Sequence, residues 1–141
     1  MRIGITGATG FIGSALSKHL KASGLDIIEY VREPFETNQV KIDLCWKTLT
    51  RNYLEDIDIL IHCAANVHKK NKLDSIFEQN TSFTELLIDN AIKNNIRRVF
   101  FISTVGVFGV SNSDYPISDD FKLNPQNDYA KSKLEAEFIV K

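Results

Sequence analysis

The apolar positions of this chain fall into two alternating patterns. Short, nearly continuous apolar runs lie at residues 2–6, 26–32, 40–44, 57–63 and 99–103. Helical periodicity, with apolar side chains every three or four residues, covers residues 11–22, 75–94 and 129–141. Continuous apolar runs are typical of strands that are covered on both faces of a sheet. The pattern therefore predicts an α/β fold in which helices connect parallel strands.

Two connections lack either pattern. Residues 46–54 predict a weak helix or an irregular crossover. Residues 106–128 are rich in turn formers and contain two prolines, so they predict a long surface connection, and long ordered loops often carry function. Ser75 and Glu78 have the spacing of a capping box, which places the start of the longest helix at Ser75.

The first strand leads directly into a glycine-rich turn. Gly7, Gly10 and Gly13 are three residues apart, and the first predicted helix begins among them at Phe11. Glycine permits the backbone angles of a tight turn and leaves the helix N-terminus bare, so its unpaired N–H groups can face a phosphate. The turn therefore predicts binding of a dinucleotide pyrophosphate, and the alternative is a purely structural turn.

Other polar or small segments follow strands in the same way. Ala64-Ala65 comes after the run at residues 57–63, and Ser103-Thr104 comes after the last run. In a doubly wound sheet, ligands bind at the carboxyl ends of the strands, near the switch in strand order. We expect these segments and the glycine turn to converge on one edge of the sheet.

Tyr129 and Lys133 lie four residues apart in the last predicted helix, so their side chains share one face. The pKa of a free tyrosine is about 10, and a neighbouring ammonium stabilises the phenolate. Lys133 is therefore expected to lower the pKa of Tyr129 toward neutral pH, where a general acid and base is most effective. The alternative is that the pair matches this spacing by chance.

The hydroxyl of Thr104 is a candidate to hold a substrate oxygen while Tyr129 exchanges the proton. Ser103 is adjacent and, by strand alternation, is expected to point the other way. The alternative for either hydroxyl is a structural cap at the end of a strand.

Composition narrows the functional classes. A chain of 141 residues predicts one domain, and 43% apolar with 25% charged residues is typical of a soluble globular protein. A net charge of −1 gives little support to a nucleic-acid or anionic-membrane partner. Cys45 and Cys63 lack metal-ligand spacing and lie in apolar surroundings, and no run approaches the length of a membrane span. We expect reduced thiols, no metal site, no membrane segment and a cytoplasmic location.

Together these motifs resemble the extended short-chain dehydrogenase/reductase family, in particular its NAD(P)-dependent nucleotide-sugar epimerase/dehydratase branch. Residues 6–13 resemble the family's TGxxGxxG cofactor loop, and residues 129–133 resemble its YxxxK catalytic pair. Residues 62–65 are similar to its HxAA segment, and residues 103–109 to its SSxxVYG segment. The resemblance implies a Rossmann-like sheet with strand order 3-2-1-4-5.

The resemblance also implies roles for single residues. The catalytic residues would be Thr104, Tyr129 and Lys133. Asn80 matches the helix asparagine that holds the active-site geometry, and Asp43 matches the position that usually contacts the adenine. The cofactor would be bound by Gly7, Thr9, Gly10, Phe11, Ile12, Gly13, Arg32, Asp43, Leu44, Ala64, Ala65, Asn80, Ser103, Tyr129 and Lys133.

Two positions depart from the family pattern. NAD-preferring members usually carry Asp at the end of the second strand, where this chain has Val31 followed by Arg32. An arginine attracts the 2′-phosphate that an acid would repel, so we expect NADP to be preferred over NAD. The alternative is that Arg32 stacks on the adenine or faces solvent. Phe108 stands where the family often has Tyr, which removes a hydroxyl near the substrate.

The resemblance implies an epimerase that transfers a hydride at a sugar carbon through a keto intermediate. One alternative is an NADPH-dependent reductase of a nucleotide-sugar or another ketone, and another is a non-catalytic NAD(P)-sensing module. Family members continue beyond the YxxxK helix with a substrate-binding part. We therefore expect residues 1–141 to form the dinucleotide-binding domain of a longer chain, poorly active in isolation.

Extended family members often dimerise by packing two helices against their copies. The corresponding helices here are residues 75–94 and 129–141, so a homodimer is expected. The candidate contacts are Phe83, Leu87, Leu134 and Phe138. The alternative is that some of these side chains face the sheet.

Overall fold

The computed structural model describes residues 1–42, 52–67, 76–109 and 116–141. Five strands in these ranges form one parallel sheet in the order β3-β2-β1-β4-β5, which confirms the predicted order. The strands are β1 (Arg2–Thr6), β2 (Asp26–Val31), β3 (Gln39–Lys41), β4 (Ile59–His62) and β5 (Arg98–Phe101).

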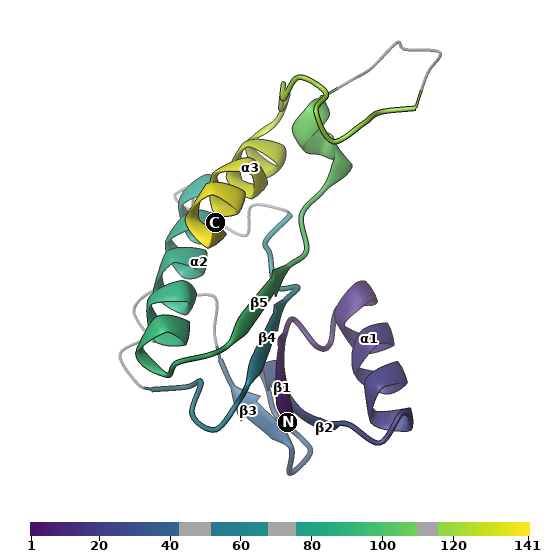
Figure 1. The fold of residues 1–141 in the computed structure, drawn as a ribbon, viewed down its shortest axis with the longest axis vertical. Coiled ribbons are helices and arrows are strands. Elements are labelled where there is room, and N and C mark those ends of the chain that lie inside the picture. Colours follow the sequence, from purple (N-terminus) through teal and green to yellow (C-terminus); the bar gives the residue numbers. More distant parts are fainter. Residues whose placement is uncertain (43–51, 68–75, 110–115) are drawn as a thin grey trace.

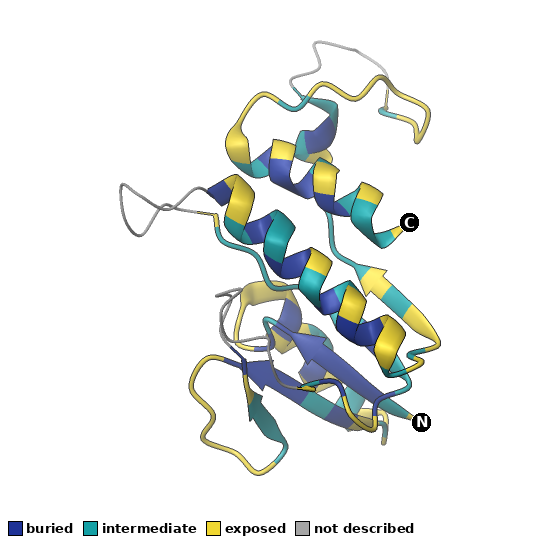
Figure 2. Cartoon of the chain, turned by 90° about the vertical axis from the view of Figure 1, so that its left-hand side faces the viewer, coloured by how far each residue is buried: buried dark blue, intermediate teal, exposed yellow. Residues whose placement is uncertain are grey.

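Helices cover both faces of the sheet, which gives three layers (Figure 1). Helix α1 (Phe11–Ala22) lies on one face. Helices α2 (Ile76–Lys93) and α3 (Asp128–Val140) lie side by side on the other face, as Figures 1 and 2 both show. A single 3-10 helix, η2 (Val105–Phe108), follows β5 within the described residues.

The alternation of side chains along the strands divides the core into two parts. Ile3, Ile5 and Ile27 pack on the side of α1. Tyr30 and Leu60 point to the opposite side and pack with Phe83, Leu87 and Ala91 of α2. Because the strands are parallel and covered on both faces, their apolar runs are continuous, as the sequence predicted.

One row of side chains crosses the sheet near the carboxyl ends of its strands. Thr6 of β1 is in register with Tyr30 of β2 and with His62 of β4, and His62 is in register with Phe101 of β5. The residues that directly follow this row form the edge at which the predicted site segments converge.

The observed elements differ from the predicted ones mainly at their ends. Strands β4 and β5 end at His62 and Phe101, one or two residues before the predicted ends, and β3 is shorter than predicted. The 3-10 helix was not predicted, because its four residues are too few to show a period. The proposed capping residue Ser75 and most of residues 46–54 lie outside the described residues.

The buried face of α3 also differs from the predicted apolar stripe. Its buried residues are Ala130, Ser132, Lys133 and Ala136. Phe138, predicted to share the apolar stripe, is instead 56% exposed. The helix therefore buries small and polar side chains against its neighbours.

None of the helices in the described part of the chain combines the length and the apolar character that crossing a bilayer requires.

Candidate dinucleotide site

The glycine turn packs directly against the segment that follows β4. Gly7 has φ +69°, a left-handed conformation that glycine adopts readily. A Cβ atom on Gly7 would lie 2.8 Å from the backbone nitrogen of Ala64, and a Cβ atom on Gly13 would lie 2.2 Å from the carbonyl oxygen of Gly7. Only glycine therefore fits at these two positions without a shift of the backbone.

The N-terminus of α1 is open to a ligand. Its N-cap residue, Gly10, has no side chain to occupy the first N–H groups, and the first turn carries no acidic residue. Free N–H groups and the positive end of the helix dipole favour an anion at this place. The chain thus fits the pyrophosphate of a dinucleotide, as the sequence predicted.

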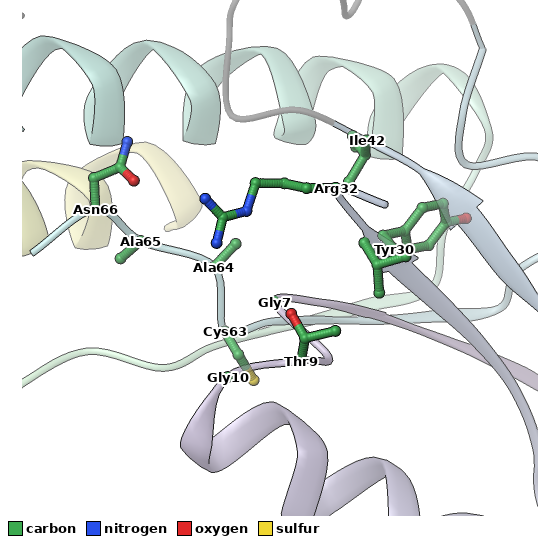
Figure 3. A pocket seen from close by; sticks show the side chains of 11 residues that line it. Gly7, Thr9, Gly10, Tyr30, Arg32, Ile42, Cys63, Ala64, Ala65 and Asn66 are labelled. Atoms are coloured by element: carbon green, nitrogen blue, oxygen red, sulfur yellow. The ribbon is translucent and has the colours of Figure 1, made fainter. Parts of the chain in front are cut away.

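A cavity of about 200 Å³ lies beside this turn (Figure 3). Six of the predicted cofactor residues line it, namely Gly7, Thr9, Gly10, Arg32, Ala64 and Ala65. The lining also contains Tyr30, Val31, Ile42, Cys63 and Asn66, which are not among the predicted cofactor residues. Cys63 and Asn66 directly flank Ala64-Ala65 in the sequence, and this position could have predicted that they line the cavity.

Arg32 is exposed at the end of β2 and lines the same cavity. In Figure 3 its side chain extends from the end of β2 toward Ala64, so its guanidinium lies across the cavity from Thr9. A permanent positive charge at this point suits a phosphate or the face of an adenine ring.

The other predicted cofactor residues near the turn are placed differently. Phe11, Ile12 and Gly13 form the first turn of α1 beside the cavity, and the side chain of Phe11 is 96% exposed. Asp43 and Leu44 lie outside the described residues.

Asn80 of α2 connects three segments. Its Oδ1 accepts a hydrogen bond from the backbone N–H of Asn66 at 2.8 Å, and its Nδ2 donates to the carbonyl of Asn66 at 3.0 Å. Its Nδ2 also donates to Oγ of Ser132 in α3 at 2.9 Å. Ser132 in turn donates to the carbonyl of Tyr129 at 2.8 Å. Asn80 therefore ties the lining of the cavity to the helix that carries Tyr129 and Lys133.

Lys133 lies buried at the carboxyl ends of β4 and β5. Its side chain is 2% exposed and its Nζ lies 3.7 Å from the centre of the Phe101 ring. Burial lowers the pKa of Lys133 to about 8, and its charge acts on Cys63, a residue of the cavity lining. The lysine of the predicted pair therefore lies at the carboxyl end of β5, although it is not one of the residues that line the cavity.

The predicted lowering of the Tyr129 pKa is wrong for this structure. Tyr129 is half-buried, and burial raises its pKa. The physical reason is that removal of the phenol from water disfavours the phenolate, whereas the ammonium of Lys133 is directed to the Phe101 ring.

The two hydroxyl residues after β5 are both bonded within the protein. Thr104 Oγ1 accepts from the backbone N–H of Gly106 at 3.2 Å, so it caps η2. The hydroxyl of Ser103 donates to the carboxylate of Glu137 in α3. Both residues line a second cavity, of about 650 Å³, rather than the cavity beside the glycine turn.

Comparison with known proteins identifies a family and relatives that this chain resembles along most of its length. A profile of the "NAD dependent epimerase/dehydratase family" matches residues 3–141. The chain is 30% identical to UDP-glucose 4-epimerase of Vibrio cholerae, over 94% of its own length and 44% of the relative's. It is also 30% identical to dTDP-D-glucose 4,6-dehydratase of Dictyostelium discoideum, over 99% of its own length and 39% of the relative's.

The fold has solved counterparts as well. The crystal structure of UDP-N-acetylglucosamine 4-epimerase from Bacillus cereus superimposes with a TM-score of 0.84 and 29% identity. That match covers 99% of this chain and 47% of the other. The chain therefore spans less than half the length of each of these three relatives.

These matches confirm the resemblance inferred from the motifs, and a nicotinamide dinucleotide is the cofactor by which the family is described. The chain belongs to the NAD-dependent epimerase/dehydratase family.

Proposed function

We propose that the protein is an NAD(P)-dependent nucleotide-sugar epimerase whose dinucleotide-binding part is formed by residues 1–141. The observation that carries the proposal is the position of Lys133, which is 2% exposed and holds its Nζ 3.7 Å from the ring of Phe101, the last residue of β5. Relatives named as epimerases of UDP-sugars support the substrate class.

We assign the roles of this chain's residues from the motifs in which they occur. Removal of a hydride from a sugar carbon and its return are the chemistry that bound NAD(P) supplies. Tyr129 exchanges the proton of the sugar hydroxyl, and Thr104 holds the oxygen. With a pKa of about 8, Lys133 is mainly protonated at neutral pH, so it holds a positive charge beside Phe101 at the end of β5.

Arg32 supports a second candidate, an NADPH-dependent ketone reductase. Its guanidinium lines the cavity at the end of β2, where a 2′-phosphate would be attracted. NADPH is the usual donor for net reduction, whereas an epimerase recycles its bound cofactor. The two candidates differ in product: an epimerase converts a UDP-sugar with no net change in cofactor absorbance, and a reductase consumes NADPH in proportion to the product.

Substitution of Tyr129 tests catalysis in the full-length protein. Tyr129→Phe is expected to lower turnover of UDP-glucose or UDP-N-acetylglucosamine by about 10²–10⁴-fold, because the proton-exchanging group is lost. The Kd for NAD(P), measured by calorimetry, is expected to stay within about twofold of the wild type. A wild-type protein that binds the cofactor but turns over neither UDP-sugar nor ketone contradicts the enzyme proposal and favours a sensing module.

We also propose a homodimer through α2 and α3. Phe83 and Leu87, two of its predicted contacts, are 1% and 0% exposed and belong to the core between α2 and the sheet, so they cannot contribute. Phe138 on α3 is 56% exposed and takes their place as the main apolar contact. Phe138→Lys is expected to convert a dimer to a monomer in sedimentation velocity, and a monomeric wild type at high concentration would contradict the proposal.

A further inference from the structure

His62 lies at the centre of the sheet and has no role in the chemistry proposed above. Its side chain is 1% exposed and stands in the register row between Thr6 of β1 and Phe101 of β5. The ring packs against Phe83 and Phe101, with centroid separations of 5.6 and 5.4 Å. Both ring nitrogens nevertheless have a hydrogen-bond partner. Nδ1 contacts Oγ1 of Thr6, and Nε2 contacts Oγ1 of Thr84 in α2.

The hydrogen bond of Thr84 determines which ring nitrogen carries the hydrogen. Thr84 Oγ1 donates to the carbonyl of Asn80 at 2.8 Å, which uses its one hydrogen. In the 3.1 Å contact between Thr84 Oγ1 and His62 Nε2, the threonine oxygen must therefore accept. Nε2 is consequently the protonated nitrogen of His62.

The charge of the His62 ring determines whether its other nitrogen, Nδ1, donates or accepts a hydrogen bond. Burial, together with the charge of Lys133, lowers the pKa of His62 to about 3, so the ring is neutral and Nδ1 is an acceptor. Thr6 Oγ1 then donates to Nδ1 at 2.7 Å. The lone pairs of Thr6 Oγ1 are left to accept the backbone N–H of Ala64 at 3.3 Å.

Four hydrogen bonds therefore run in one direction, from the N–H of Ala64 through Thr6, His62 and Thr84 to the carbonyl of Asn80. Both ends of this chain belong to the candidate site. Ala64 lines the cavity, and Asn80 binds the backbone of Asn66 in the same lining.

We propose that His62, held as its Nε2–H tautomer by Thr84, is a positioning residue that sets the place of Ala64 against the glycine turn through Thr6. The backbone of Ala64 packs so closely on Gly7 that a Cβ atom on Gly7 would lie 2.8 Å from the Ala64 nitrogen. The segment after β4 therefore leaves no room for a side chain on the glycine turn. The effect on ligand binding rests on the proposed NAD(P) site. The tautomer of His62 and the hydrogen-exchange rate of the Ala64 amide do not depend on that site.

The tautomer is tested directly by NMR. In protein labelled with 15N-histidine, long-range proton–nitrogen correlations at neutral pH distinguish the two neutral tautomers and the imidazolium. We expect His62 as the neutral Nε2–H form. The Nδ1–H form, or a protonated ring, would overturn the proposed direction of the hydrogen bonds.

A pair of substitutions at Thr84 tests the positioning role without altering the lining of the cavity. Thr84→Val keeps the shape but removes the acceptor of Nε2–H, whereas Thr84→Ser keeps the hydroxyl. In Thr84→Val we expect faster hydrogen exchange at the Ala64 amide and about tenfold weaker binding of NAD(P), equivalent to one lost hydrogen bond. Thr84→Ser is expected to restore both to near wild-type values.

A purely structural role for His62 gives a different result. In that case Thr84→Val lowers the unfolding temperature but leaves the Ala64 exchange rate and the Kd of the folded protein unchanged, which overturns the proposal. If the wild type binds neither NAD nor NADP, the proposed cofactor site is wrong. The tautomer and the Ala64 exchange then decide whether His62 positions this loop.

Discussion

The ammonium of Lys133 lies 3.7 Å from the centre of the Phe101 ring, inside the protein. Phe101 is in register with His62 on the neighbouring strand. The negative face of the ring attracts the cation and offsets part of the free energy lost when the ammonium leaves water. The remaining penalty lowers the pKa of Lys133 to about 8. A charge held at such a position is more readily explained by function than by stability.

Replacement of this lysine is expected to stabilise the fold. Lys133→Met keeps the length of the side chain but removes the buried charge, so we expect the free energy of unfolding in urea to rise by about 1 kcal/mol. Lys131→Met, at an exposed position of the same helix, is the matched control and should change it by less than about 0.5 kcal/mol. A clear loss of stability in Lys133→Met would show that the lysine is a net stabilising contact.

The same substitution has a defined pH dependence. The pKa of Lys133 is about 8 in the folded protein against an ordinary value of 10.5 for lysine, so between these values the unfolded chain binds more protons. The stability contribution of Lys133 therefore rises with pH across this window, by up to about 1.4 kcal/mol per pH unit. The advantage of Lys133→Met over the wild type should stay constant well below pH 8, disappear about one pH unit above pH 8, and be reversed by pH 10.5.

Gly13→Ala is expected to damage the turn itself. The new Cβ atom would lie 2.2 Å from the carbonyl oxygen of Gly7, and backbone on both sides must move to accommodate it. We expect a loss of about 1–3 kcal/mol in thermal or urea unfolding, together with loss of NAD(P) binding. Gly106→Ala is the control, because its Cβ atom would meet only Thr104 and Ala130 side-chain atoms at 3.4 Å or more. Equal effects of the two substitutions would contradict the argument from close packing.

Two asparagines of α2 provide a comparison at equal burial. Asn80 is 6% exposed and bonds to Asn66 and Ser132 in other segments. Asn90 is 7% exposed, and its Nδ2 donates to the carbonyl of Leu86 in its own helix. Asn80→Ala leaves buried partners unsatisfied and should cost about 2–4 kcal/mol in unfolding, against about 1 kcal/mol for Asn90→Ala. Similar losses would mean that Asn80 does not connect the helices energetically.

Arg32 determines the cofactor in our proposal. Arg32→Glu replaces an attractive charge by a repulsive one at the predicted site of the 2′-phosphate, so the Kd for NADP should rise by about 10- to 100-fold. The Kd for NAD should change by much less. Lys18→Glu, at an exposed position on α1, has the same change of charge and serves as the control. Calorimetry with both dinucleotides checks the result, and an equal loss for NAD and NADP would favour stacking of Arg32 on the adenine.

Much of the fold was predictable from local signals. Period and apolar content located the strands and helices, because each depends on residues close together in the chain. Gly7 and Gly13 marked the turn because no other residue fits its backbone. The ends of elements and the 3-10 helix were less predictable, because the hydrogen bonds that end a strand come from neighbours distant in sequence.

The sequence motifs predicted candidate residues for the site but not the contacts between those residues. The motifs predicted Asn80, Tyr129 and Lys133 as site residues. The pKa of Tyr129 moves opposite to the prediction, because spacing on a helix does not specify where a lysine side chain is buried. The link from Asn80 to Ser132 likewise joins residues 52 positions apart. No local pattern encodes such a pair.

The sequence by itself determined the order of strands and helices, the glycine turn and the family, since these depend on local backbone preference and on motif spacing. Only the tertiary structure decided that Lys133 faces Phe101 and that His62 has Thr6 on one side and Thr84 on the other. The register of parallel strands and the packing of α2 determine those neighbours. Both arise from contacts between residues far apart along the chain.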